Sequence, residues 1–265
     1  MEVHHHSHIH KQEEHNETAR AGQHAPKKVK WTHYLWEFLM LFLAVFCGFM
    51  AENQREHMVE NQRGRQYIYS MVVDLQTDTA NLTSIIDSYL RRGVLFDSLI
   101  AGFSEGIRSY SPWSQKFLRS YRGGFPDFYG TDRTIDQLKN AGGLRLIKNQ
   151  KAAAGIIAYD AAVKDVVNEQ TGMANAHLRY IEEVLKVWSV RRLYQDNGVT
   201  NWYMNRQTMT KDNYWLTKDP LAFEYLYNNM AEYNEAIIRQ TRWYRELKVT
   251  AVSLIELLKK EYNIK

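Results

Sequence analysis

The feature that most constrains this chain is a long apolar stretch near its N-terminus. Residues 31–51 read WTHYLWEFLMLFLAVFCGFMA and contain a single charged side chain, Glu37. A helix of this length, rising about 1.5 Å per residue, spans roughly 31 Å, which matches the hydrocarbon core of a bilayer. Aromatic side chains at its start are typical of a membrane interface, and a polar run follows at 52–56. The sequence predicts a transmembrane helix at 31–51.

A cleaved signal peptide is the competing interpretation of this stretch. Cleavage needs small residues at the −3 and −1 positions, but a cut after Ala51 would place Phe49 at −3. A lipoprotein cut before Cys47 would require a small residue where Phe46 stands. We therefore expect the stretch to remain attached as an anchor.

The charges that flank the stretch predict its orientation. Lys27, Lys28 and Lys30 precede it, whereas Glu52 and Glu56 follow it. Because cations favour the cytoplasmic side of a membrane, we expect residues 1–30 to be cytoplasmic and residues 52–265 to be periplasmic. The expected location is a bacterial inner membrane.

Glu37 has two interpretations, because acidic side chains are costly inside a bilayer. It lies one to two turns into the helix, so the carboxylate can reach headgroup water at the cytoplasmic interface. Alternatively, several copies of the helix associate, and Glu37 faces their interior and carries a proton or a cation. The sequence leaves both interpretations open.

The residues before the anchor form a histidine-rich tail that we expect to be disordered. Neighbouring imidazoles can chelate a divalent metal such as Zn, Ni or Cu. The candidate ligands are His4, His5, His6, His8 and His10. An engineered tag usually has an uninterrupted run, but Ser7 and Ile9 break this one, which favours a natural tail. Composition alone defines no geometry for such a metal site.

Beyond the anchor, apolar residues recur at spacings of three and four, which is typical of a helix that packs along a seam. This seam, in a coiled-coil-like pattern, is formed by Ile68, Val72, Leu75, Leu82, Ile86 and Tyr89. The first helix is predicted to end near residues 91–93, which read Arg-Arg-Gly. An insert at 93–143 follows, rich in glycine and aromatic residues. Its loop at 122–130 forms either a ligand-binding rim or a segment folded back onto a helix.

Two further long helices are predicted, at about 150–195 and from Pro220 to about Tyr262. The expected fold is all-α, an N-terminal transmembrane helix followed by an elongated antiparallel bundle within 52–265. In that arrangement the second long helix returns toward the membrane. The loop at 197–219 then lies near the membrane, and the insert lies at the far end. His177 falls on an apolar stripe and is expected to be a hydrogen-bonded core residue rather than a metal ligand.

Composition and motifs exclude several classes of function. The 34 basic residues nearly balance the 30 acidic ones, so a dedicated nucleic-acid binder is not expected. Cys47 is the only cysteine, which rules out an internal disulfide and a multi-cysteine zinc site. The sequence contains no metalloprotease, hydrolase, P-loop or dinucleotide-binding motif. We therefore expect a protein that is not an enzyme.

Two segments resemble a family of uncharacterised single-span membrane proteins of Bacteroidetes-type bacteria. The first is the opening MEVHHHSH together with KWTHYLWEFLMLFLAVFCGFMAENQREH, and the second is TIDQLKNAGGLRLIKN at 134–149. The resemblance implies an inner-membrane protein with a helical periplasmic domain. It implies no activity, substrate or catalytic residue.

Three functions are consistent with these patterns. The leading hypothesis is a structural or scaffold component of the cell envelope, whose partners are the lipid bilayer and either further copies of itself or another envelope protein. The second is a metal- or ion-handling membrane oligomer that uses the histidine tail and Glu37. The third is a periplasmic ligand sensor that acts through a partner.

Overall fold

The computed structural model describes the chain except for residues 1–30, 105–110, 141, 193–213 and 265, and the chain divides into two compact units, Met1–Arg55 and Glu56–Lys265. Its elements are α1 (Trp31–Ser104), α2 (Ser111–Arg122), α3 (Arg133–Asn140), the 3-10 turn η1 (Gly143–Leu146), α4 (Gln150–Val187) and α6 (Pro220–Tyr262). Within the described ranges the only β pairing is an isolated bridge between Trp188 and Trp215. The all-α prediction is confirmed.

The first unit contains the start of α1. Every residue from Trp31 to Ala51 is exposed, and an 18-residue window of this helix has a mean hydropathy of 1.9 with none of it buried. Among the described residues, this is the one helix long and apolar enough to cross a membrane. An apolar surface of this kind is unfavourable in water, and the segment is consistent with membrane anchoring.

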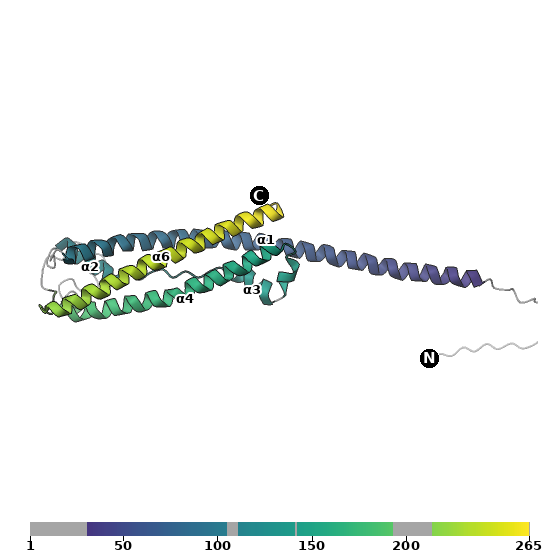
Figure 1. Ribbon diagram of the computed structural model, residues 1–265. Coiled ribbons are helices and arrows are strands. Elements are labelled where there is room, and N and C mark those ends of the chain that lie inside the picture. The colour runs from purple at the N-terminus through teal and green to yellow at the C-terminus, as the bar shows by residue number, and fades with distance from the viewer. Residues whose placement is uncertain (1–30, 105–110, 141, 193–213, 265) are drawn as a thin grey trace, which may run out of the picture. The chain divides into compact units, whose positions relative to one another are not determined.

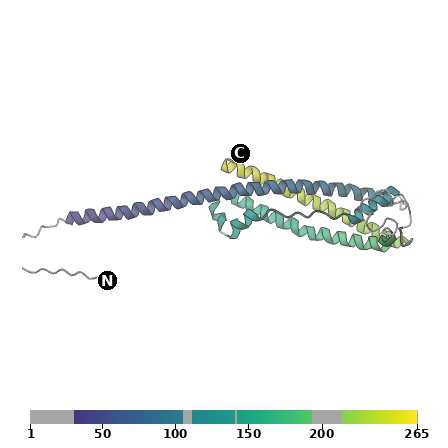
Figure 2. The ribbon, with the colours of Figure 1, turned by 180° about the vertical axis from the view of Figure 1, so that it is seen from behind.

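The second unit is a helical bundle built on the antiparallel pair α4 and α6, which lie side by side in Figures 1 and 2. At one end Gly155 of α4 lies against Leu254 of α6. Further along, the rings of Tyr180 and Tyr233 stack with centroids 5.4 Å apart. The second part of α1 completes the bundle, because its Phe96 contacts both of these tyrosines.

The direction of α4 differs from the prediction. Asp78 of α1 bonds Tyr159, and Phe96 packs on Tyr180, so both helices advance in the same direction and α4 is parallel to α1. Of the three long helices α1, α4 and α6, only α6 runs against the other two. The described end of the predicted 197–219 loop therefore does not lie beside the start of the bundle. Its Trp215 packs on Phe117 and Phe223 instead, at the end of the bundle that we call distal.

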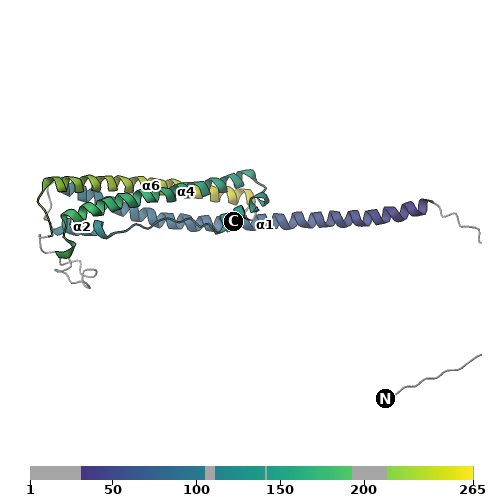
Figure 3. The same ribbon diagram turned by 90° about the horizontal axis from the view of Figure 1, so that it is seen from below.

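A parallel neighbour requires a connection that travels the length of the bundle, and residues 123–132 supply it. This segment, here called the strap, contains no helix and runs from α2 back along the bundle to α3 (Figure 3). Phe125 of the strap packs on Tyr89 and Tyr233, and Phe128 packs on Tyr244. The strap thus fills a position in the bundle that a fourth helix would otherwise occupy.

The predicted ends of the first two long helices are wrong, whereas the predicted final helix is confirmed. The helix α1 continues through Gly93 to Ser104, and α4 ends at Val187 rather than near 195. The predicted final helix is confirmed as α6, Pro220–Tyr262. Its start is fixed locally, because the Asp219 side chain accepts a hydrogen bond from the backbone N–H of Leu221, 3.0 Å away.

The core of this unit is rich in aromatic side chains. Tyr89, Phe96, Tyr180, Tyr233 and Tyr244 are fully buried and pack against one another. The six seam residues are also buried within this single chain: Ile68, Val72, Leu75, Leu82, Ile86 and Tyr89. Because their side chains are already covered, this seam holds the bundle together rather than offering a surface to a second copy.

Candidate functional site

The residues predicted to hold a metal fall outside the described part of the chain. His4, His5, His6, His8 and His10 lie within residues 1–30. Among the described residues, no group of three or more His, Cys, Asp or Glu side chains is placed to hold a metal ion. The structure therefore adds no coordination geometry to the expectation drawn from the tail.

Glu37 is exposed on the apolar helix and has a partner one turn earlier. Its Oε1 lies 3.2 Å from Nε2 of His33, and 62% of its side chain is accessible. Phe38, Phe42 and Phe46 form a ladder of stacked rings along another stripe of the helix. The pairing of Glu37 with His33 lowers the cost of placing either polar group next to lipid.

Two aspartates of α1 that sequence reasoning missed are each 1% exposed. One holds the end of the strap, and the other holds the start of α3. Asp78 accepts hydrogen bonds from the backbone N–H and the hydroxyl of Thr131, at 2.9 and 2.7 Å, and from the Tyr159 hydroxyl at 2.7 Å. Burial, and then the adjacent carboxylate, raises the pKa of Tyr159 far above its usual range. The phenol therefore stays protonated and continues to donate to Asp78.

Asp74 lies one turn before Asp78 and binds the start of α3. It receives a hydrogen bond from Arg133 at 2.5 Å and another from the Thr134 hydroxyl. A buried carboxylate is tolerated only when its oxygens are paired in this way. Together, the two aspartates attach the end of the strap to the middle of α1.

Gln170 of α4 holds the strap from its other side. Its side-chain amide bonds both backbone groups of Phe128, accepting from the N–H at 2.6 Å and donating to the carbonyl at 3.1 Å. The Tyr244 hydroxyl donates to the same side-chain oxygen at 2.7 Å. An extended segment has no internal hydrogen bonds, so these side chains replace the pairing that a helix would have provided.

Arg92 passes through the interior beside the strap. Its Nη2 donates to the Ser120 carbonyl at 2.7 Å, and its guanidinium lies 4.8 Å from the centre of the Phe125 ring. A Cβ at position 123 would stand 1.4 Å from Nη1 of Arg92. Gly123 therefore leaves the space that the guanidinium occupies. The predicted end of α1 at 91–93 is wrong because Arg92 turns inward rather than capping the helix.

His177 lies near this arginine on α4. Its ring stacks on Tyr233 with centroids 5.0 Å apart, and its buried Nε2 makes no hydrogen bond within the described residues. Burial, followed by the positive charge of Arg92, lowers the pKa of His177 below its ordinary value. The residue is half-buried and stacks on Tyr233, and its Nε2 lacks the hydrogen bond that a core histidine was expected to make.

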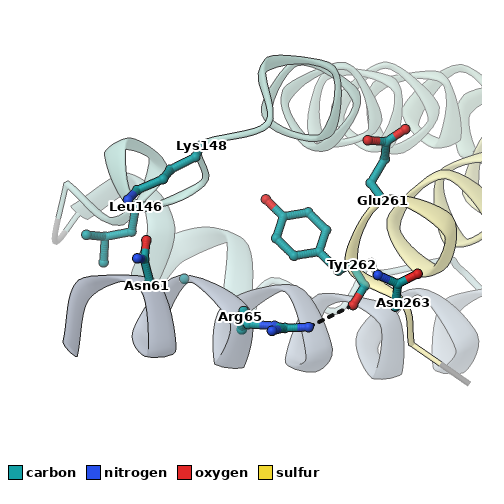
Figure 4. A pocket seen from close by; sticks show the side chains of 8 residues that line it. Asn61, Arg65, Leu146, Lys148, Glu261, Tyr262 and Asn263 are labelled. Atoms are coloured by element: carbon teal, nitrogen blue, oxygen red, sulfur yellow. Dashed lines mark hydrogen bonds between the residues drawn. The ribbon is translucent and has the colours of Figure 1, made fainter. Parts of the chain in front are cut away.

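An open pocket of about 410 Å³ lies at the end of the bundle opposite the distal end. Here residues 61–65 of α1 meet the end of α6 (Figure 4). Arg65 donates to the Tyr262 carbonyl at 3.1 Å. A Cβ on Gly64 would come within 2.5 Å of the Leu146 carbonyl oxygen, so this glycine permits η1 to approach α1. The other lining residues are Asn61, Lys148, Glu261 and Asn263. Arginine and lysine share this pocket with a glutamate, so it has no single-sign charge.

A second hollow, of about 310 Å³, lies beside the strap. It is lined by Asn81, Ser84, Ile85, Asp127, Phe128 and Tyr129. The fold-back alternative for the 122–130 loop is confirmed for Phe125 and Phe128, which pack into the bundle. Tyr129 is 71% accessible, and a ligand-binding rim there stays a prediction. We call this hollow the Tyr129 groove.

No protein-family model, curated protein or solved structure matches this chain. Its function must therefore be inferred from the features described above.

Proposed function

We propose that this chain is a single-pass membrane protein whose helical unit serves as a structural or interaction component of the bacterial cell envelope. Residues 1–30 are cytoplasmic and residues 52–265 are periplasmic in this proposal. The chain performs no catalysis and binds no nucleic acid. Its partners are the bilayer and either further copies of itself or another envelope protein.

The observation that carries the proposal is the contrast between the two parts of α1. Apolar side chains of residues 31–51 are exposed throughout, whereas those of the second unit close over an aromatic core. A water-soluble helix would bury one apolar stripe, and this segment buries none. The positive flank at Lys27, Lys28 and Lys30 supports the proposed orientation.

Membrane extraction and reporter fusions test the anchor and its orientation. The protein should stay in the membrane pellet after alkaline carbonate washing. An alkaline phosphatase fused after residue 265 should be active, because that enzyme requires the periplasm, and the same reporter placed before residue 31 should be inactive. Release by carbonate, or the reverse pattern of reporter activity, would contradict the proposal.

Cys47 offers a direct test of self-association, because it is the only cysteine and is exposed on the apolar helix. If copies associate through the face that contains it, mild oxidation in native membranes should give a disulfide-linked dimer. The Cys47→Ser variant should give none. A second variant, Phe46→Cys in the Cys47→Ser background, moves the thiol to another face of the helix. Comparing dimer formation by the two thiols distinguishes association through one face from random collision. A monomer at both positions would favour a different envelope partner.

A second candidate, metal or ion handling, has one specific observation in its favour. Glu37 and His33 form a paired acid and base within the apolar helix, and intramembrane ionisable pairs often mark ion pathways. Zn²⁺, Ni²⁺ or Cu²⁺ would be collected by the histidine tail in this case. If Glu37→Gln and a deletion of residues 1–24 leave metal tolerance and ion flux unchanged, this candidate is wrong.

A further inference from the structure

The Tyr129 groove combines an exposed aromatic ring with polar side chains that have no other role in the fold. The polar side chains are Asn81 and Ser84 of α1 and Asp127 of the strap, all of them exposed. None of the three side chains makes a hydrogen bond or an ion pair with another described residue. A single exposed tyrosine needs no explanation, but one that stands beside three unused hydrogen-bonding groups indicates a ligand site.

The backbone that presents Tyr129 is held on both sides. Gln170 bonds both backbone groups of Phe128, and Asp78 binds the backbone N–H and hydroxyl of Thr131. Gln170 is 8% exposed and Asp78 is 1% exposed, so both anchors are set in the core. An aromatic ring on a fixed backbone loses little further freedom when a ligand stacks on it, and this pre-organisation favours binding.

The lining chemistry indicates which ligand suits the groove. Its hydrogen-bonding groups are one carboxylate, one amide and one hydroxyl, which together accept from and donate to neighbouring hydroxyl groups. The lining contains no lysine or arginine, so a phosphate or carboxylate ligand is disfavoured. A quaternary ammonium ion is usually held by several aromatic rings, whereas Tyr129 is the one ring exposed in this lining.

We propose that the Tyr129 groove binds a saccharide. A sugar ring lies with its C–H face on the Tyr129 ring, while Asp127, Asn81 and Ser84 bond its hydroxyl groups. The volume of about 310 Å³ and the open form suit one or two rings of a longer glycan. This site gives the helical unit a partner of defined chemistry, independently of whether the chain self-associates.

The test uses the full-length protein in lipid nanodiscs, because maltoside and glucoside detergents would themselves compete for the site. The probes are chitotriose and maltotriose, and binding is measured by saturation-transfer NMR with a concentration series. We expect at least one of the two sugars to bind, with transfer strongest at the C–H groups of one ring face. Tyr129→Ala should weaken that binding about tenfold, and Tyr129→Phe should keep it within about twofold.

A matched control separates the groove from general surface effects. Tyr225 is also exposed, at 54%, but lies outside the groove, so Tyr225→Ala should bind the sugar as the unaltered protein does. Asp127→Asn should weaken binding while leaving the thermal unfolding transition unchanged. The proposal is overturned if neither sugar binds at millimolar concentration, or if Tyr129→Ala binds as well as Tyr225→Ala. Binding of tetramethylammonium in place of both sugars would also overturn it, in favour of a cation site.

Discussion

Among single residues, Asp78 has the most consequential contacts, because one buried carboxylate joins the strap to both α1 and α4. Its three donors come from Thr131 and Tyr159. Removing the acceptor leaves these donors unpaired in the core, and each unpaired group retains its desolvation penalty. The loss of unfolding free energy is therefore larger than the net contribution of the three hydrogen bonds.

We expect Asp78→Ala to lower the free energy of unfolding by about 3 kcal/mol. Tyr159→Phe removes the donor to Oδ2 of Asp78, while Thr131 still bonds Oδ1. Because it leaves one buried carboxylate oxygen unpaired, it should cost about 1–3 kcal/mol. Denaturant unfolding of the full-length protein in micelles, followed by helical circular dichroism, measures both. Asp87→Ala is the control, since Asp87 is exposed on the same helix and should change stability by under about 0.5 kcal/mol. A large effect at Asp87 would contradict this account.

His177 gives a residue-scale prediction about pH. Its pKa in the folded protein is depressed by burial and by Arg92, from an ordinary value of 6.5. Below about pH 6.5 the unfolded chain therefore binds a proton that the folded chain resists. This histidine consequently lowers stability as the pH falls through that range, and it has no such effect at higher pH.

The unfolding free energy of His177→Gln should accordingly fall less between pH 7 and pH 5 than that of the unaltered protein. An NMR titration of the His177 imidazole supplies an independent readout. A midpoint at or above 6.5 would refute the inferred burial.

At the scale of elements, local signals predicted helices, while tertiary contacts decided how they connect. The Asp219 cap and Pro220 fixed the start of α6 in the sequence itself. The end of α1 could not be found this way, because Arg92 and Gly93 look like a helix stop in the sequence. The contacts that draw Arg92 inward, to the Ser120 carbonyl and the Phe96 and Phe125 rings, exist only in the folded protein. The direction of α4 was equally hidden, since it depends on strap anchors that resemble ordinary surface residues in sequence. Asp74 and Asp78 lie four residues apart on an apolar stripe, and this spacing is the signal in the sequence that indicates buried charge.

Two glycines in helices of the second unit test how closely its elements approach. A Cβ on Gly64 would come within 2.5 Å of the Leu146 carbonyl oxygen, whereas one on Gly172 of α4 meets nothing within 4 Å. Gly64→Ala should therefore destabilise by about 1–3 kcal/mol through overpacking. Gly172→Ala should stabilise by about 0.5–1 kcal/mol, because alanine loses less backbone entropy in a helix. We expect the two variants to change the free energy of unfolding in opposite directions in the same denaturation assay. Equal changes would show that η1 does not pack closely against α1.

For the whole molecule, the decisive property is that the second unit contains its own core. Every residue of that core lies at or beyond Ile68, and none belongs to the first unit. The apolar side chains of residues 31–51, in the first unit, are all exposed. Membrane attachment and bundle stability should therefore be separable.

We expect a fragment of residues 56–265 to be soluble and helical and to unfold cooperatively, within about 4 °C of the full-length protein. The matched control begins at residue 75, which removes the buried side chains of Ile68, Met71 and Val72 and the Arg65 bond to the Tyr262 carbonyl. Losing three buried apolar side chains costs several kcal/mol, so the shorter fragment should melt much lower or aggregate. Thermal circular dichroism and light scattering measure both fragments. If the longer fragment also aggregates, the first unit or a partner must cover part of the bundle, and the exposed side chains of α1 near Tyr69 would be the place to look for that contact.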